Sequence, residues 1–86
     1  MSTSSITIEV LLFSVLRERV GAGHVEVTVP APTTARGVLE AVVEAYPSVA
    51  DYERVVRIAV NQEYVTDEAP VQAGDEVALI TPVSGG

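Results

Sequence analysis

The 86-residue chain contains no cysteine, no lysine and no tryptophan, and it has one histidine. Without cysteine, disulfides, thiol nucleophiles and thiolate metal sites are excluded. His24 alone cannot complete a zinc site, and a catalytic base also needs a partner that orients it. We therefore expect no metal site, no bound cofactor and no catalysis by this chain alone.

Long apolar runs are also missing. Glu9 interrupts the apolar stretch of residues 6–16, and no stretch approaches the roughly 20 residues of a membrane span. The first residues lack the basic segment that begins a signal peptide. We expect one soluble cytoplasmic domain, residues 1–86, in which residues 1–5 are frayed.

Charge of one sign dominates the chain. Twelve acidic residues stand against 5 arginines, which gives a net charge of −7. Such a surface repels phosphate backbones, so we expect no nucleic-acid partner. Because no membrane span is present, we also expect no membrane partner. The same charge favours attraction to a basic protein.

Alternating apolar residues predict two strands near the start of the chain. They are Ile6, Ile8, Val10 and Leu12 in the first strand, and Val25, Val27 and Val29 in the second. Leu11 and Phe13 add apolar side chains to the polar side, so we expect the end of the first strand to be covered on both faces. Residues 14–19 suit one helical turn, and residues 21–23 suit a turn.

Helical spacing follows, in Val38, Leu39, Val42, Val43 and Tyr46. Thr33 or Thr34 is expected to cap this helix, and Pro47 ends it. Gly37 is a weak point, which costs up to about 1 kcal/mol relative to alanine. A connector over residues 48–54 has room for one helical turn.

The second half of the sequence predicts further strands over residues 56–60, around 64–65 and over 76–80, with a loop at 67–74. The order β-β-α-β-β-β predicts an α+β fold with a mixed sheet and one main helix packed on one face. The β-grasp, or ubiquitin-like, fold has this order and length.

The last six residues, 81–86, suit a thin mobile tail. Glycine has no Cβ, so Gly85 and Gly86 can thread a channel too narrow for other residues. Pro82 ends strand pairing, and Val83 can dock in a partner's pocket. We expect Gly86 to present its carboxylate to another protein.

The final strand predicts a docking face. If Val77 and Leu79 point to the core, Ala78 and Ile80 point to the opposite face, which Ala59 and Val55 would share. An apolar patch there would mark a protein-binding surface. The alternative is that a loop of the chain covers Ile80.

Several blocks together resemble the small subunits of molybdopterin synthases. The blocks are Leu11-Leu12-Phe13, Leu16-Arg17-Glu18, Ala59-Val60-Asn61, Gly74-Asp75-Glu76-Val77-Ala78 and Pro82-Val83-Ser84-Gly85-Gly86. The likeness covers the chain after Ser5. The chain departs from the family at Thr81, where a second proline is common, and at Gln62, where glycine is common.

The resemblance implies a sulfur carrier with a ubiquitin-like fold. An adenylating, E1-like partner would use ATP to activate the Gly86 carboxylate, which sulfur then converts to a thiocarboxylate. A large subunit would bind Ala59, Ala78 and Ile80 and take the tail, Pro82 to Gly85, into its active site. There the thiocarboxylate would donate sulfur to a pterin precursor, within a heterotetramer of two small and two large subunits.

Other functions remain open from the sequence alone. A carrier of the same fold could serve thiamine, cysteine or tRNA thiolation, with the same tail chemistry and a different partner. A ubiquitin-like modifier would attach Gly86 to lysines of other proteins. A third class is an interaction module in which the Gly-Gly end is incidental.

Overall fold

The computed structural model describes residues 4–82. Its elements are β1 (Ser5–Leu12), α1 (Ser14–Val20), β2 (His24–Pro30), β3 (Thr33–Thr34), α2 (Ala35–Ala45), the 3₁₀ helix η1 (Pro47–Tyr52), β4 (Arg57–Val60), β5 (Glu63–Tyr64), β6 (Pro70–Val71) and β7 (Glu76–Ile80). In this part of the chain, no helix is both long and apolar enough to cross a membrane.

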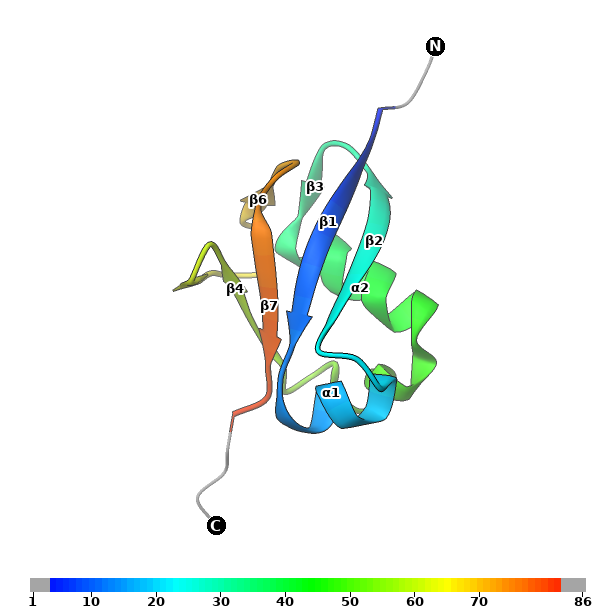
Figure 1. Cartoon of the computed structure of the whole chain (residues 1–86). Helices are drawn as coiled ribbons and strands as arrows, with labels where there is room; N and C mark the ends of the chain where they lie inside the picture. The colour runs from blue at the N-terminus through cyan, green and yellow to red at the C-terminus, as the bar shows by residue number, and fades with distance from the viewer. Residues whose placement is uncertain (1–3, 83–86) are drawn as a thin grey trace.

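A mixed sheet forms the centre of the molecule, with its strands in the order β2-β1-β7-β4-β5. β1 and β7 run parallel, and the other neighbouring pairs are antiparallel. The helix α2 lies across one face of this sheet, behind β1 and β2 in the view of Figure 1. The prediction of an α+β β-grasp with one main helix on one face is confirmed.

The core lies between the sheet and α2. The sheet contributes Ile8, Val10, Leu12, Val25, Val27, Val29, Ile58, Val77 and Leu79, and α2 contributes Ala35, Val38, Leu39 and Val42. Burying one valine, leucine or isoleucine side chain contributes roughly 1.5–3 kcal/mol. The alternation that predicted β1 and β2 is therefore also the alternation that builds the core.

The first strand begins earlier than its sequence suggests. Residues 1–3 lie outside the described part, but Ser5 already pairs with Pro30. The carbonyl of Ser4 accepts a hydrogen bond from the amide of Ala31 at 2.8 Å. A frayed segment over residues 1–5 is therefore wrong for Ser4 and Ser5, because both extend the ladder between β1 and β2.

Two short strands were not predicted from the sequence. β3 and β6 pair with each other, and Val71 is buried, although the sequence suggested a loop over residues 67–74. A two-residue strand is too short to show alternation, and a proline argues against a strand interior. The segments that suited single helical turns form α1 and η1, and the brief fourth strand forms as β5.

The start of α2 is held by its own cap and by a neighbouring loop. The Thr34 hydroxyl oxygen accepts a hydrogen bond from the amide of Gly37 at 3.1 Å, which identifies Thr34 as the cap. The amides of Ala35 and Arg36 donate to the carbonyls of Ala69 and Asp67, each at 2.9 Å. The loop before β6 thus satisfies amides of the first helical turn that have no partner within the helix.

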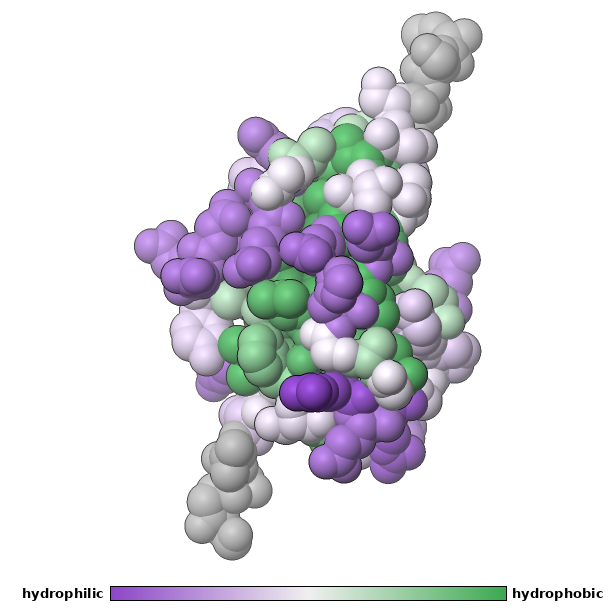
Figure 2. Space-filling model, viewed as in Figure 1, coloured by the Kyte–Doolittle hydropathy of each residue, from purple (hydrophilic) through white to green (hydrophobic). Residues whose placement is uncertain are grey.

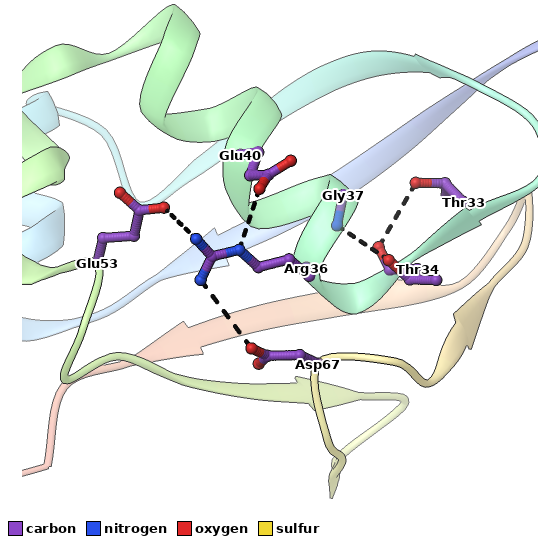
Figure 3. A network of polar contacts seen from close by, with 7 residues as sticks. All are labelled: Thr33, Thr34, Arg36, Gly37, Glu40, Glu53 and Asp67. Carbon is purple, nitrogen blue, oxygen red and sulfur yellow. Dashed lines mark hydrogen bonds and ion pairs between the residues drawn. The ribbon is translucent and has the colours of Figure 1, made fainter.

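Arg36 joins three segments that are distant in the sequence (Figure 3). Its Nη2 lies 2.9 Å from Glu53 Oε2, its Nε lies 3.1 Å from Glu40 Oε2, and its Nη1 lies 4.0 Å from Asp67 Oδ2. The hydrogen bond with Glu40, together with the charges of Glu53 and Asp67, raises the pKa of the Arg36 guanidinium. The contacts link α2, the segment after η1 and the loop before β6.

The side chain of Thr33 leaves room only for glycine at position 37, so Gly37 does more than weaken the helix. A Cβ built at this position would come against the Oγ1 atom of Thr33. We expect Gly37→Ala to lower the free energy of unfolding by about 1 kcal/mol, because crowding outweighs the gain in helix propensity. In a Thr33→Ala background, Gly37→Ala should raise the free energy of unfolding by up to about 1 kcal/mol. Chemical denaturation of the four proteins of this cycle measures both values, and equal effects in the two backgrounds would contradict the explanation.

Candidate functional site

One face of the sheet is not covered by α2. On β1, Glu9 and Leu11 point to this open face, since their neighbours in the chain point to the core. The strand registers place Leu11 opposite Ala78, Ala78 opposite Ala59, and Ala59 opposite Tyr64. Four residues from four strands therefore form one row across the sheet.

This row is the centre of an apolar patch. The apolar patch consists of Leu11, Phe13, Ala59, Tyr64, Ala78 and Ile80, which line one shallow hollow. Tyr64 is 65% exposed and Phe13 is 44% exposed. Figure 2, which looks onto the open face, shows hydrophobic surface over the C-terminal halves of β1 and β7. Such a surface on a small protein is typical of a docking site.

The three docking residues named from the sequence lie together in this patch. Ala59, Ala78 and Ile80 all line the hollow, and Ile80 is half-buried. Covering of Ile80 by a loop is therefore not found in residues 4–82. Val55 is not part of the patch, because it precedes β4 and lines a different hollow together with Pro82.

Other members of the patch were missed or misplaced. The expectation that Leu11 and Phe13 are covered on both faces is wrong, because Leu11 is half-buried and Phe13 is exposed on the open face. The sequence predicts Tyr64 only as part of a brief strand. The available signal was an apolar side chain at a position where the alternation calls for a polar one.

Carboxylates border the apolar patch on the side away from the end of β7. Glu9 lies opposite Glu26 on β2 and opposite Glu76 on β7, so the three form a second row. His24 Nε2 lies 3.1 Å from Glu9 Oε2. Like charges directly opposite each other destabilise a sheet, so this row costs stability and gives the open face a negative border. A partner with an apolar centre and basic side chains beside it would complement this face.

The chain leaves the sheet next to the apolar patch. Ile80 is the last residue of β7, and Pro82 follows as an exposed residue. Proline has no amide hydrogen and ends strand pairing. The expected tail residues Val83, Ser84, Gly85 and Gly86 lie outside the described residues.

A side-chain network fixes the other end of β7. Asn61 Nδ2 donates to Asp75 Oδ1 at 3.1 Å, and Asn61 Oδ1 accepts from the amide of Glu76 at 3.0 Å. Asn61 and Gln62 have φ values of 52° and 71°, the left-handed conformation that glycine adopts most readily. Two of the blocks that carried the family resemblance, residues 59–61 and 74–78, are thus bonded to each other. Together they position the strand that leads to the tail.

Asp75 gives this network a pH dependence. Its carboxylate accepts hydrogen bonds from the amide of Gln72, at 2.8 Å, and from Asn61, and these hold its pKa below the ordinary value of 3.8. A pKa that is lowered in the folded state adds stability above the unfolded pKa, and this stability is lost as the pH falls through the folded value. Among residues 4–82, no cluster of histidine, aspartate and glutamate is placed to hold a metal ion.

We therefore expect Asp75→Asn to lower the free energy of unfolding at neutral pH. Because the carboxylate is exposed, the decrease should be smaller than for a buried carboxylate. The gap in the free energy of unfolding between the variant and the wild type should narrow as the pH falls below 3.8 and through the lowered pKa of Asp75. Urea denaturation at a series of pH values measures this gap. A gap that does not change with pH would show that the charge of Asp75 has no part in stabilising the turn.

Known proteins resemble the chain over nearly its whole length. The sequence profile of the ThiS family matches residues 10–86. The molybdopterin synthase sulfur carrier subunit of Arabidopsis thaliana is 42% identical over 84 residues, which are 98% of this chain and 88% of that protein. The subunit of the same name from Homo sapiens is 37% identical over 82 residues, which cover 92% of this chain and 93% of that protein.

A solved structure shows the same fold at a similar level of identity. The small archaeal modifier protein 1 of Haloferax volcanii is 31% identical, with a TM-score of 0.83, over 91% of this chain and 99% of that one. The profile match includes every residue of the apolar patch and the network at Asn61 and Asp75. The chain therefore belongs to the ThiS family and groups with the molybdopterin synthase sulfur carrier subunits, as the sequence resemblance implied.

Proposed function

We infer that this chain works in the cytoplasm as the sulfur carrier subunit of a molybdopterin synthase, and that the Gly86 carboxylate carries the sulfur. The observation that supports this most is the 42% identity to the Arabidopsis thaliana sulfur carrier subunit over 98% of the chain. The apolar patch beside the end of β7 agrees with it, because a carrier must dock where its tail departs.

The chemistry begins with activation of the carboxylate. A carboxylate is a poor electrophile, so an adenylating, E1-like partner would let a Gly86 oxygen attack the α-phosphorus of ATP and release pyrophosphate. A hydrosulfide-level sulfur would then attack the carbonyl carbon of the acyl-adenylate. The carbon–oxygen bond to AMP breaks, AMP leaves, and a thiocarboxylate remains. ATP is consumed by the partner, and this chain holds no cofactor in the proposed reaction.

The thiocarboxylate is a soft nucleophile that can transfer its sulfur to a pterin precursor. In this proposal the catalytic groups belong to the large subunit, and this chain supplies the reactive sulfur and the docking face. Ala59, Ala78 and Ile80 contact the large subunit, and Pro82 to Gly85 lie in the passage to its active site. Two copies of each subunit make the working heterotetramer.

Covalent geometry limits where the partner's reaction centre can lie. The four residues from Val83 to Gly86 span at most roughly 14 Å when fully extended. Both partners must therefore bring their reacting groups within about this distance of Pro82, and docking on the apolar patch next to Pro82 satisfies that limit. The narrow Gly85-Gly86 end suits an approach through a confined passage.

Intact-protein mass spectrometry tests the proposal directly. The chain is incubated with an adenylating enzyme, ATP and sulfide, and we expect a species in which one C-terminal oxygen is replaced by sulfur. This species should be absent without ATP and absent from a chain that lacks Gly86. If the adenylating enzyme converts a known carrier but leaves this chain unchanged, the assignment of that partner is wrong. If no adenylating enzyme of the family modifies the chain, the carrier function itself is wrong.

A protein modifier is the second candidate, and one observation favours it. The similar Haloferax volcanii protein is named a small archaeal modifier protein. Attachment to other proteins would use the same activated Gly86, with a lysine amine in place of sulfur as the nucleophile. Cells that express an epitope-tagged chain would then contain isopeptide-linked conjugates, which peptide sequencing by mass spectrometry identifies. A carrier for thiamine, cysteine or tRNA thiolation would yield the thiocarboxylate and differ only in the protein that accepts the sulfur.

A further inference from the structure

The edge of β2 is a second surface that the proposed function does not use. β2 lies at one end of the strand order, and within residues 4–82 it pairs with β1 alone. Four of the six residues of the apolar patch, Ala59, Tyr64, Ala78 and Ile80, lie on β4, β5 and β7, which the strand order places beyond β1 from β2. A ligand at this edge would therefore leave the apolar patch and the exit of the tail free, and would share only Glu26 with the negative border of the open face.

Two hydrogen bonds at the ends of the β1–β2 ladder show which backbone groups face outward. The amide of Leu12 donates to the carbonyl of Gly23 at 2.9 Å, and the amide of Ala31 donates to the carbonyl of Ser4 at 2.8 Å. Bonded pairs alternate with non-bonded pairs in an antiparallel ladder. Val25, Val27 and Val29 therefore bond to β1, whereas His24, Glu26 and Thr28 direct their amides and carbonyls away from it.

This edge has little of the usual protection against pairing. Natural edge strands carry charged side chains, proline or a bulge that hinders the addition of another strand. Between His24 and Val29, β2 has no lysine, proline or bulge, Glu26 is its one acidic residue, and its register with β1 is continuous. Pro30 ends the strand, so the free edge is centred on Glu26 and Thr28.

A groove runs beside this edge. It lies between β2 and α2, has a volume of about 760 Å³, and includes Val27, Val29, Ala41 and Ala45 among its lining residues. Its lining residues also include Glu26, Glu40 and Glu44 and no basic residue, although the Glu26 side chain, opposite Glu9, points to the open face of the sheet. Glu40 already pairs with Arg36, which leaves Glu26 and Glu44 as the exposed charges available to a ligand.

We propose that the β2 edge and this groove bind an extended basic peptide segment of another protein, which adds an antiparallel strand to the sheet. Residues of the segment that lie directly opposite Glu26 share its face of the sheet, so lysine or arginine fits there. The intervening residues point to the side of α2, where small apolar side chains fit the groove. Backbone hydrogen bonds supply affinity in this mode of recognition, and alternate side chains supply specificity.

The charges argue against a second copy of this chain as the occupant. Two copies would each bring a net charge of −7 to the contact. The Glu26 carboxylates of the two copies would lie on the same face of the new strand pair without any lysine to balance them. Like charges opposed in this way are destabilising, whereas a basic segment turns the same carboxylates into an attraction.

A synthetic peptide of alternating lysine and valine, seven residues long and blocked at both ends, serves as the probe. Titration into the full-length protein is followed by NMR of the backbone amides. We expect the largest shift changes along β2 and slower hydrogen exchange at the amides of Glu26 and Thr28. Changes centred on the apolar patch, or self-association through β2 without peptide, would overturn the proposal.

Matched peptides separate strand addition from simple charge attraction. In an antiparallel pair the lysine amides face β2 and the valine amides face away. Methylation of the lysine amide nitrogens should therefore weaken binding by about tenfold or more, and methylation of the valine amide nitrogens should change it little. Equal binding by the two methylated peptides would overturn the proposal, and so would equal binding by a peptide with glutamate in place of lysine.

Variants of the protein provide the complementary test. Thr28→Pro removes an outward amide and keeps the bonds to β1, because prolines are tolerated on edge strands where the amide faces solvent. The double change Glu26→Gln with Glu44→Gln removes the charges and keeps the backbone. We expect each variant to bind the peptide with about tenfold lower affinity. If the proline variant does not fold, the methylated peptides still decide the question on the unchanged protein.

Discussion

We expect a chain that lacks Gly86 to deliver no sulfur and to fold as the full chain does. The core of the domain consists of residues within the range 8–79, so removal of one terminal residue takes nothing from it. It does move the reactive carboxylate back by roughly 3.5 Å, the rise of one extended residue. A misplacement of about 1 Å can already cost a factor of about 10² in rate, so we expect sulfur transfer to fall to the background level.

An added residue should have the same effect as a removed one. A single alanine after Gly86, shown by mass spectrometry not to be trimmed, places a side chain in the passage and moves the carboxylate too far. Sulfur transfer is measured by conversion of a pterin precursor with the large subunit present, and the free energy of unfolding is measured in parallel. Unchanged stability with lost transfer supports the role of Gly86. Transfer at more than a tenth of the normal rate by either variant would show that the carboxylate of Gly86 is not the working group.

We expect Ile80→Asp to weaken binding of the large subunit strongly and to leave the domain folded. Ile80 is half-buried on the open face, next to the start of the tail and within the apolar patch. A carboxylate there would be desolvated in the complex without a partner, and we expect a loss of at least about 2 kcal/mol, or roughly thirtyfold in affinity. In the free domain the change is tolerable, because position 80 lies opposite Arg57 on β4.

Thr7→Asp is the matched control for this experiment. Thr7 is exposed on the same open face, but it lies on β1 beyond the row of glutamates and outside the apolar patch. The two variants carry the same added charge, so a general effect of charge would weaken both. Calorimetric titration with the large subunit should show lost affinity for the first variant and near-normal affinity for the second, with both folded by circular dichroism. Retained binding by the Ile80 variant would remove the apolar patch from the docking site.

The principal elements of the fold were predictable because their signals are local. Period-two alternation identified β1 and β2, and the spacing of Val38, Leu39 and Val42 identified α2. The pairing of β3 with β6 was not predictable, since Thr33–Thr34 and Pro70–Val71 are too short for a period and are held by contact with each other. The need for glycine at position 37 was hidden for the same reason, because it depends on where the Thr33 side chain lies.

The docking residues were predictable only in part. The alternation of side chains along β7 assigns Ala78 and Ile80 to the face opposite Val77 and Leu79, and the structure agrees with that assignment. The same alternation could not assign Tyr64 and Phe13 to the patch, because each lies on a different segment whose neighbouring strands the sequence does not specify. Residues 83–86, which carry the proposed chemistry, were identified from the sequence alone and lie outside the described residues.

The sequence by itself determined which side chains share a face of each strand, where α2 lies in the chain, and the family resemblance that led to Gly86. Only the tertiary structure decided which strands are neighbours. The parallel pairing of β1 with β7 and the antiparallel pairing of β7 with β4 bring Leu11, Ala78 and Ala59 into one row, and they leave β2 with a free edge. The physical reason is that alternation arises from the geometry of a single strand, whereas strand order depends on contacts between residues far apart in the chain, which no local pattern encodes.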